Sequence, residues 1–313
     1  MTIFQQKETP MTIRPLTRRA LIAAALTFAA LPALALDVET YAGKVTVEGT
    51  PLKVAVFDVA ALDTLLAIGV MPAGIPENLY LAELSDLKGK AEVVGDIFEP
   101  DLEALSALEP DLIIVGGRSS GKEKETVKVA PSLDMTMDGV DVVDQVRERA
   151  TTYGAIFGKQ AEAEKAVADF DAALGRAKAA VQGKGKGLIV MTNGPKITAY
   201  GVDSRFGWVH KALDLPPAVE DVEAATHGEP VSFEFIAKAN PDWLLVLDRA
   251  AAIGANDQNA KTTLDNDLVA ETKAWKSGQV IYLPSADFYI AAGGLKATER
   301  VLAAIDAGFS ASQ

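Results

Sequence analysis

The stretch AEAEKAVADFDAALGRAKAAV, residues 161–181, decides the fold expected of this chain. Its apolar residues recur at steps of three and four, which predicts a helix with one apolar stripe. These residues are Val167, Phe170, Leu174, Ala177 and Val181. At about 1.5 Å per residue the helix would span roughly 32 Å, the width of a small domain. Periodicity alone leaves open a surface helix on a single domain.

Two copies of one pattern flank this helix. The first copy consists of Glu103, Pro110-Asp111, the apolar run LIIVGG and Arg118. The second consists of Glu234, Pro241-Asp242, the apolar run WLLVLD and Arg249. Residue types and spacing agree throughout, which is typical of an internal repeat. Each copy predicts a helix carrying the Glu, a turn, a buried parallel strand and an Arg at the strand's end. We therefore expect two similar α/β lobes joined by one helix.

The flanking sequence sets the expected boundaries of these lobes. Strands and helices alternate on both sides of the helix, so we expect parallel sheets with helices on both faces. The N-terminal lobe is predicted over residues 36–159, the connecting helix over 160–182 and the C-terminal lobe over 183–313. In such sheets, ligands bind beyond the C-terminal ends of the strands. This rule places Arg118 and Arg249 in a cleft between the lobes.

The N-terminus predicts export. Arg18-Arg19 precede an apolar run, and Ala33-Leu34-Ala35 fits a signal-peptidase site. Residues 1–35 are therefore interpreted as a cleaved signal peptide, of either the twin-arginine or the general secretory type. The apolar run is too short for a comfortable membrane anchor. The chain has no cysteine, which excludes disulfides and a lipid-modified N-terminal Cys. An exported chain without a lipid anchor indicates a periplasmic protein.

Charge excludes two classes of partner. The full chain carries a formal net charge of −13. Residues 1–35 hold four basic residues and one acidic residue, so the mature chain carries −16. So acidic a protein is a poor candidate for binding nucleic acid or an anionic membrane.

Catalytic and metal-binding signatures are missing from the sequence. Its two histidines, His210 and His227, have no partner at metal-ligand spacing. The nucleophile elbow, the P-loop and the dinucleotide-binding glycine pattern are also missing. The informative polar groups are arginines, whose permanently charged, forked guanidinium groups suit an anionic ligand. Either Arg118 or Arg249 alone could be a surface salt-bridge partner, but their equivalent positions in the repeat favour a shared anion site.

Three stretches together resemble the periplasmic binding proteins of ferric-siderophore ABC importers. They are THGEPVSFEFIAKANPDWLLVLDR (226–249), LEALSALEPDLIIVGGR (102–118) and GVDSRFGWVHKAL (201–213). The resemblance covers essentially all of the mature chain and is strongest to proteins that bind ferric catecholates of the petrobactin and enterobactin types. It implies two Rossmann-like α/β lobes with parallel sheets, joined by one long rigid α-helix.

The resemblance also implies a set of ligand-binding residues. The cleft arginines of the family fall on Arg118, Arg205 and Arg249. His227 and Tyr289 match a His and a Tyr that complete the iron shell when a siderophore supplies only four oxygens; either residue could instead be a wall of the pocket. The segment SADFYIAAGG around Tyr289 departs from the family pattern.

Glu103 and Glu234 match the carboxylates, one per lobe, that dock on basic residues of the membrane permease. A permease dimer presents two equivalent basic patches, which suits two equivalent glutamates. The alternative is that both are ordinary solvated helix charges.

The expected function is therefore binding without catalysis. The protein would capture an anionic ferric catecholate in an arginine-lined cleft and deliver it to an ABC permease dimer, acting as a monomer with no resident cofactor. Alternatives are a haem or cobalamin carrier of the same fold, or a secreted enzyme. A neutral corrinoid would leave three arginines without an anionic partner, and the missing catalytic residues disfavour the enzyme.

Overall fold

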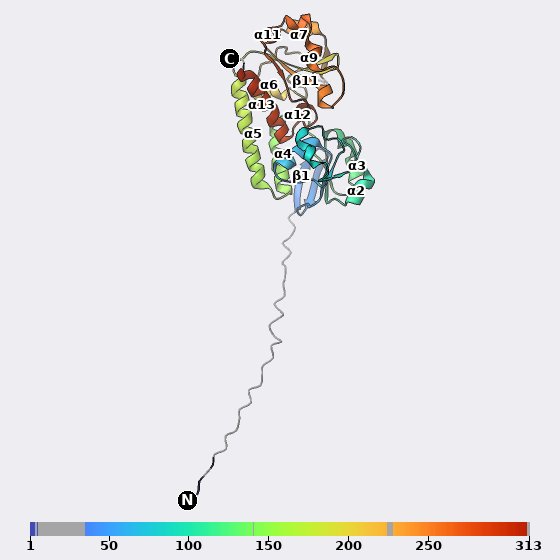
Figure 1. The fold of residues 1–313 in the computed structure, drawn as a ribbon, viewed down its shortest axis with the longest axis vertical. Coiled ribbons are helices and arrows are strands. Elements are labelled where there is room, and N and C mark those ends of the chain that lie inside the picture. Colours follow the sequence, from blue (N-terminus) through green and yellow to red (C-terminus); the bar gives the residue numbers. More distant parts are fainter. Residues whose placement is uncertain (4, 6–34, 140, 224–227, 312–313) are drawn as a thin grey trace. The chain divides into compact units, whose positions relative to one another are not determined.

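A computed structural model of the chain describes residues 1–3, 5, 35–139, 141–223 and 228–311. The chain divides into two units, Met1–Ala33 and Leu34–Gln313. All but a few residues of the predicted signal peptide lie outside the described residues, and the sheets and helices belong to the second unit (Figure 1). Within the part of the chain that the structure describes, no helix combines the length and apolar character needed to cross a membrane.

The first sheet is five-stranded and wholly parallel, as predicted for this half of the chain. Its order is β5-β4-β3-β6-β7. The strands are β3 (Val54–Val56), β4 (Gly74–Ile75), β5 (Glu92–Val93), β6 (Leu112–Val115) and β7 (Ser132–Asp134). The surrounding segments are the hairpin β1 (Ala35–Thr40) and β2 (Gly43–Glu48), with α1 (Val59–Ala67), η1 (Ala82–Leu87), α2 (Leu102–Leu108), η2 (Gly117–Lys122), α3 (Glu123–Thr126) and α4 (Val142–Ile156). Every residue of β3, β6 and β7 is buried, and the apolar runs of β3 and β6 suit strands that are covered on both faces.

The second sheet is also five-stranded, with the order β10-β9-β8-β11-β12. Its strands are β8 (Gly187–Asn193), β9 (Lys196–Tyr200), β10 (Glu229–Val231), β11 (Trp243–Asp248) and β12 (Val280–Tyr282). β11 is parallel to β8 and β12, but β9 is antiparallel to β8 and β10. This edge differs from the parallel expectation because Gly194 and Pro195 alone connect β8 to β9, and a parallel crossover needs a dozen residues or more.

The helices of the second half are mostly short. They are α6 (Trp208–Leu213), α7 (Phe233–Ala239), α8 (Arg249–Ala252), α9 (Ala260–Leu264), α10 (Asp267–Ala270), α11 (Lys273–Lys276), α12 (Ser285–Tyr289) and α13 (Leu295–Ala311).

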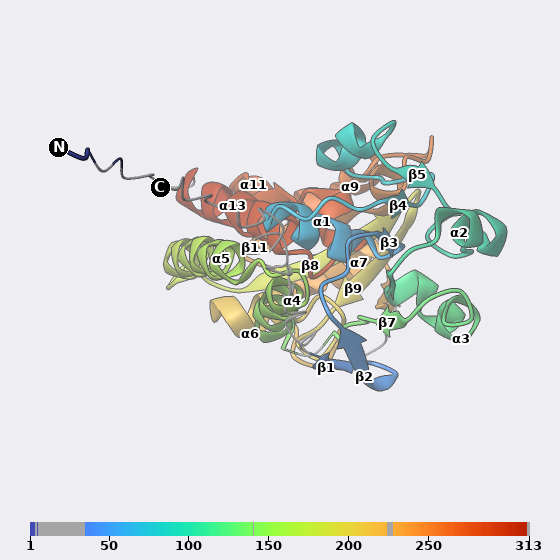
Figure 2. The same cartoon turned by 90° about the horizontal axis from the view of Figure 1, so that it is seen from below.

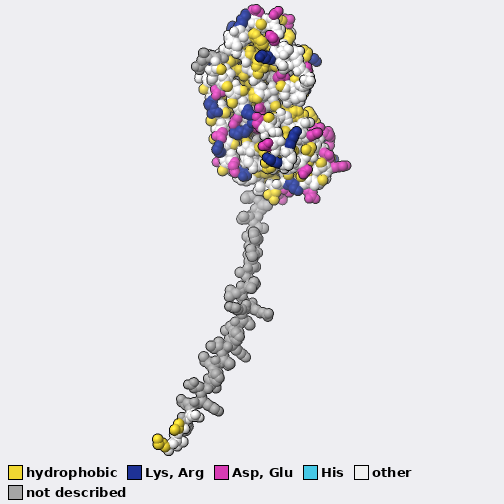
Figure 3. Space-filling view, in the orientation of Figure 1, with side chains coloured by type: hydrophobic (Ala, Val, Ile, Leu, Met, Phe, Trp, Pro, Cys, Tyr) yellow, Lys and Arg dark blue, Asp and Glu magenta, His cyan; other side chains and the backbone are white. Residues whose placement is uncertain are grey.

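Acidic side chains gather on the opposite half of the molecule, over α2 and α3, where Glu103, Glu123 and Glu125 lie in first helical turns (Figure 3).

The sequence repeat is also a structural repeat. α2 and α7 both end at a residue in the left-handed conformation, Glu109 and Asn240. One oxygen of Asp111 then accepts a hydrogen bond from the backbone nitrogen of Lys53, just before β3. One oxygen of Asp242 accepts the equivalent bond from Lys186, just before β8. The repeated Asp therefore ties the start of each repeat strand to the start of its neighbour.

The predicted connecting helix is α5 (Gln160–Val181). It buries Phe170, Ala177 and Val181 of the predicted stripe, while Val167 and Leu174 are partly buried against the same core. α13 lies alongside α5 and also packs on α1 (Figures 1 and 2). The two sheets are therefore linked by two packed helices, and α5 does not act alone.

Candidate functional site

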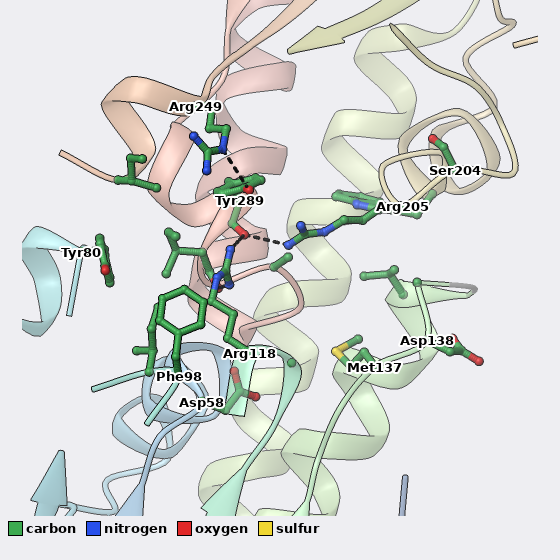
Figure 4. A pocket seen from close by; sticks show the side chains of 18 of the residues that line it. Asp58, Tyr80, Phe98, Arg118, Met137, Asp138, Ser204, Arg205, Arg249 and Tyr289 are labelled. Atoms are coloured by element: carbon green, nitrogen blue, oxygen red, sulfur yellow. Dashed lines mark hydrogen bonds between the residues drawn. The ribbon is translucent and has the colours of Figure 1, made fainter. Parts of the chain in front are cut away.

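A cavity of about 750 Å³ lies where loops from both sheets meet (Figure 4). Its lining includes the three arginines singled out by the sequence, Arg118, Arg205 and Arg249, together with Tyr289. Arg118 follows β6, and Arg249 directly follows β11. The repeat therefore brings its two arginines to one cavity, as the rule for the C-terminal ends of parallel strands predicts.

Arg118 is held by a hydrogen-bonded loop. The backbone nitrogen of Gly117, whose φ is +53°, donates to the hydroxyl of Thr136 over 2.9 Å. The hydroxyl of Ser120 donates to the buried carboxylate of Asp134, which also accepts from Thr136. These bonds join η2 to the end of β7. They fix the backbone that carries Arg118.

Arg249 opens α8, and the preceding Asp248 caps that helix. One carboxylate oxygen of Asp248 accepts from the backbone nitrogen of Ala251 at 3.0 Å, and the other accepts from Ala260 at 2.7 Å. The Arg249 side chain donates from Nη1 to Oδ1 of Asn193 at the end of β8, over 3.2 Å. Two adjacent strand ends therefore orient this guanidinium.

Arg205 comes from a tight turn before α6. The Ser204 hydroxyl donates to the Gly201 carbonyl at 2.6 Å, which closes the turn. A Cβ at Gly207 would lie 2.1 Å from the Val202 carbonyl oxygen, so only glycine fits there. Nothing in the repeat marks this turn as functional, and only the family resemblance pointed to Arg205.

Tyr289 is the residue around which the arginines gather. Its backbone carbonyl accepts from Arg118 Nη2 at 3.1 Å and from Arg205 Nη2 at 2.8 Å. Its hydroxyl accepts from Arg249 Nε at 3.3 Å. All three guanidinium carbons lie between 5.0 and 5.8 Å from the ring centre, which is cation–π range. One residue of α12 thus collects three positive charges at the centre of the site (Figure 4).

These charges alter ionisation within the site. Burial raises the pKa of Tyr289, but the hydrogen bond from Arg249 and the charges of the three arginines together hold it below its usual value. Burial and the charge of Arg118 lower the pKa of the Arg205 guanidinium. The cavity therefore favours negative charge, on a tyrosine oxygen or on a ligand.

The rest of the wall is largely apolar. It includes Tyr80, Ile97, Phe98, Met137, Val142, Trp208, Ile253 and Ile290. Phe98 is 55% exposed, an unusual state for a large aromatic side chain, and it faces the cavity. A few convergent charged groups within an apolar wall are typical of a small-molecule site.

One charged residue of the lining, Asp58, was not singled out by the sequence. Asp58 follows β3 and lines the cavity on the same side as Arg118. The signal was present, because the strand-end rule that singled out Arg118 and Arg249 applies equally to the last residue of KVAVFD (53–58).

The remaining predicted residues fall elsewhere. His227 lies outside the described residues. Glu103 and Glu234 are exposed in the first turns of α2 and α7 and do not line the cavity. His210 is buried, and its Nδ1 lies 2.9 Å from the Leu215 carbonyl oxygen. Across the described ranges, no three His, Cys, Asp or Glu side chains are grouped as metal ligands.

The sequence of this chain is similar to those of known periplasmic binding proteins. A family profile of periplasmic binding proteins matches residues 54–286. The petrobactin-binding protein YclQ of Bacillus subtilis is 37% identical over 262 residues, which is 82% of each chain. The ferric-anguibactin-binding protein FatB of Vibrio anguillarum is 31% identical over 279 residues, which is 87% of each.

Solved structures of two such binding proteins are also similar to this chain. The crystal structure of YclQ matches with a TM-score of 0.83 and 35% identity, covering 88% of this chain and 99% of that one. The periplasmic catecholate-siderophore binding protein VctP of Vibrio cholerae matches with a TM-score of 0.82 and 31% identity, covering 88% and 100%. These relatives are substrate-binding proteins and not enzymes.

Proposed function

Because this chain belongs to the periplasmic binding protein family, we propose that it captures an anionic ferric siderophore of the catecholate type and delivers it to an ABC permease. The relatives YclQ, FatB and VctP are named for binding petrobactin, ferric anguibactin and a catecholate siderophore. The protein would act as a monomer in the periplasm after removal of its signal peptide, and it would have no resident cofactor.

The observation that carries this proposal is the set of three guanidinium groups around Tyr289. Among the described residues, no salt bridge neutralises Arg118, Arg205 or Arg249. Their bonds go instead to neutral carbonyl, amide and phenol oxygens. In a partly buried site three positive charges without a salt bridge repel one another, so the cavity is suited to an anion.

The size and lining of the cavity also suit the ligand class. Its volume falls in the range of about 300–1,000 Å³ usual for small-molecule sites. The exposed ring of Phe98 offers an aromatic surface for a catechol ring, while the arginines would take the negative oxygens around the metal. Haem or cobalamin remains the rival ligand, but a neutral corrinoid would leave the arginines unpaired.

Tyr289 has a second role in this proposal. With a siderophore that supplies only four oxygens, its phenolate and His227 would complete six-coordinate iron. The lowered pKa of Tyr289 favours the ionised oxygen that iron prefers. With a siderophore that supplies six oxygens, both residues would be pocket wall.

The experiment that tests the function is identification of the natural ligand. The protein is purified from iron-starved cells of the organism that produces it, and the bound small molecule is identified by mass spectrometry. A ferric complex with catechol groups supports the proposal. A co-purified porphyrin or corrinoid would overturn it, as would measured affinities for haem or cobalamin above those for every ferric catecholate.

A further inference from the structure

Asp58 stands out among the carboxylates that line the cavity. Asp138 and Asp203 also contribute to the lining, but both are exposed and engaged elsewhere. Asp203 is paired with Lys211 at 2.9 Å, and Asp138 accepts from Gln145 at 2.7 Å. Asp58 is only partly exposed, and no salt bridge among the described residues includes it. It is a half-buried negative charge in a site built to hold an anion.

The structural task of Asp58 does not need a charge. Its Oδ1 accepts from the backbone nitrogen of Ala60 at 3.2 Å and so caps α1. Asn and Ser cap helices about as well as Asp does, and this chain uses Asn259, Asn266 and Ser232 for that purpose. Capping of α1 therefore does not require the negative charge of Asp58.

The second carboxylate oxygen lies against a neighbouring strand end. A Cβ at Gly116 would come within 2.9 Å of Asp58 Oδ2, so the glycine leaves room for this oxygen beside the segment leading to Arg118. The charged and titratable groups that face Asp58 are Arg118 on η2 and Arg149 and Tyr153 on α4. Arg118 and Arg149 direct hydrogen bonds to carbonyl oxygens of Tyr289 and Thr136.

We propose that Asp58 is a proton-linked part of the pocket, which takes up a proton when an anionic ligand binds beside Arg118. The inference rests on the proposed function to the extent that the ligand must be an anion. It assigns a role in adjusting the charge of the pocket to a residue that is neither one of the three arginines nor one of the proposed iron ligands.

The electrostatics of the site support the inference. Burial raises the pKa of Asp58 to about 6, although hydrogen bonds from Ala60 and Ala61 and the charges of Arg118 and Arg149 oppose that rise. A bound anion would offset the arginine charges and add repulsion, so the pKa must rise further in the complex. The complex then holds more protons than the free protein at neutral pH. By linkage, affinity increases as pH falls from about 8 towards 6.

The test measures affinity for a ferric tris-catecholate from pH 5.5 to 8.0 in the mature wild-type protein and in Asp58→Asn. The variant keeps the helix cap and removes only the charge. Because both proteins meet the same ligand, the ligand's own titration cancels in the ratio of the two Kd values. We expect Asp58→Asn to bind about tenfold more tightly at pH 8.0, with the ratio approaching one at pH 5.5.

Asp101→Asn is the matched control, because Asp101 caps α2 in the same way but is exposed and outside the cavity. Its affinity should equal that of the wild type at every pH. A second measurement needs no variant: titration calorimetry of the wild type at pH 7 in two buffers of different ionisation enthalpy gives the number of protons taken up.

The outcomes separate the two proposals. Tight binding with no proton uptake and a flat ratio of one would overturn the role of Asp58 and leave the proposed function intact. Failure of the wild type to bind any anionic ferric complex would overturn both.

Discussion

Arg300 on α13 donates a hydrogen bond from Nη2 to Oδ1 of Asp63 on α1, over 2.9 Å. The same guanidinium bonds Asp287 on α12, two residues before Tyr289, at 2.6 and 2.9 Å. The two carboxylate side chains are only 3% and 9% exposed. One arginine therefore ties the helix that carries Tyr289 to the first helix of the other half of the molecule. Together with α5, this link favours small movements between the two sheets over wide hinge opening.

Removing this guanidinium should destabilise the protein. Arg300→Met leaves Asp63 and Asp287 buried without a positive partner, which should lower the free energy of unfolding by about 3–5 kcal/mol. Urea denaturation followed by circular dichroism measures the change. Lys165→Met on α5 is the control, because its ion pair with Asp169 is exposed and should contribute little. Equal, small effects of both substitutions would show that the Arg300 link is not a stabilising element.

Trp208 should report ligand binding. It lines the cavity and is 7% exposed, while Trp243 is buried in a stack with Phe309. A ferric catecholate should quench tryptophan fluorescence, and a neutral ferric hydroxamate should do so much less because it cannot pair with the arginines. Trp208→Phe should remove most of the quenching, whereas Trp275→Phe should not, because Trp275 is not part of the lining. Equal affinity for both ligand types would contradict an anion-selective pocket.

Much of this site follows from the sequence because the repeat and the strand-end rule act together. Arg118 and Arg249 occupy equivalent positions after buried strands, so placing them in one cavity needs only the topology of a parallel sheet. The same rule applied to KVAVFD would have found Asp58. The burial that raises the pKa of Asp58 is a property of the folded state, so the sequence pattern gives no sign of it.

Other features could not be predicted from sequence patterns. Two of the arginines bond the backbone carbonyl of Tyr289, an acceptor that every residue type carries, so residue identity gives no hint of it. Arg205 lies in an irregular turn outside the repeat and became a candidate only through the family resemblance. The Arg300 link joins residues 237 positions apart along the chain, and only the packing of α13 on α1 brings them together.

Tyr289 and His227 should discriminate between two kinds of siderophore. Tyr289→Phe keeps the ring and the backbone carbonyl that bind the arginines but removes the phenol oxygen. If that oxygen ligates iron, Tyr289→Phe should weaken binding of a tetradentate bis-catecholate far more than binding of a hexadentate tris-catecholate, and His227→Ala should do the same. A visible charge-transfer band that is lost in Tyr289→Phe would identify the phenolate directly. Identical losses for both ligands would make these residues ordinary pocket wall.

Arg249→Ala should reduce affinity for a ferric catecholate by about 2–5 kcal/mol, because the charge-assisted bonds to a buried anion are lost. Arg249→Lys should recover only part of this, since a lysine keeps the charge but lacks the fork that spans Asn193 and Tyr289. Titration of the purified variants measures both values. Lys261→Ala on α9 is the control, because Lys261 is a positively charged residue that is exposed and lies outside the cavity. This variant should bind the ferric catecholate with wild-type affinity. Full affinity in Arg249→Ala would remove this residue from the binding site.

Glu103 and Glu234 should act on the transporter and not on the ligand. Both are exposed in the first turns of equivalent helices, α2 and α7, and neither lines the cavity. The double variant Glu103→Ala, Glu234→Ala should therefore bind ferric catecholate with wild-type affinity in solution. Radio-iron uptake by whole cells should nevertheless fall, and more steeply than in either single variant, because each charge meets one half of a permease dimer.

Two further carboxylates serve as matched controls for this docking prediction. Glu148 and Asp171 stand on α4 and α5, away from the α2 and α7 first turns, and their alanine variants should leave uptake unchanged. The decisive comparison sets titration of the purified protein beside uptake for the same variants. Normal uptake in the Glu103, Glu234 double variant would reduce both residues to ordinary solvated charges. A loss of uptake that is matched by a loss of ligand affinity would instead assign them to the fold, because a docking charge must change transport while the pocket stays intact.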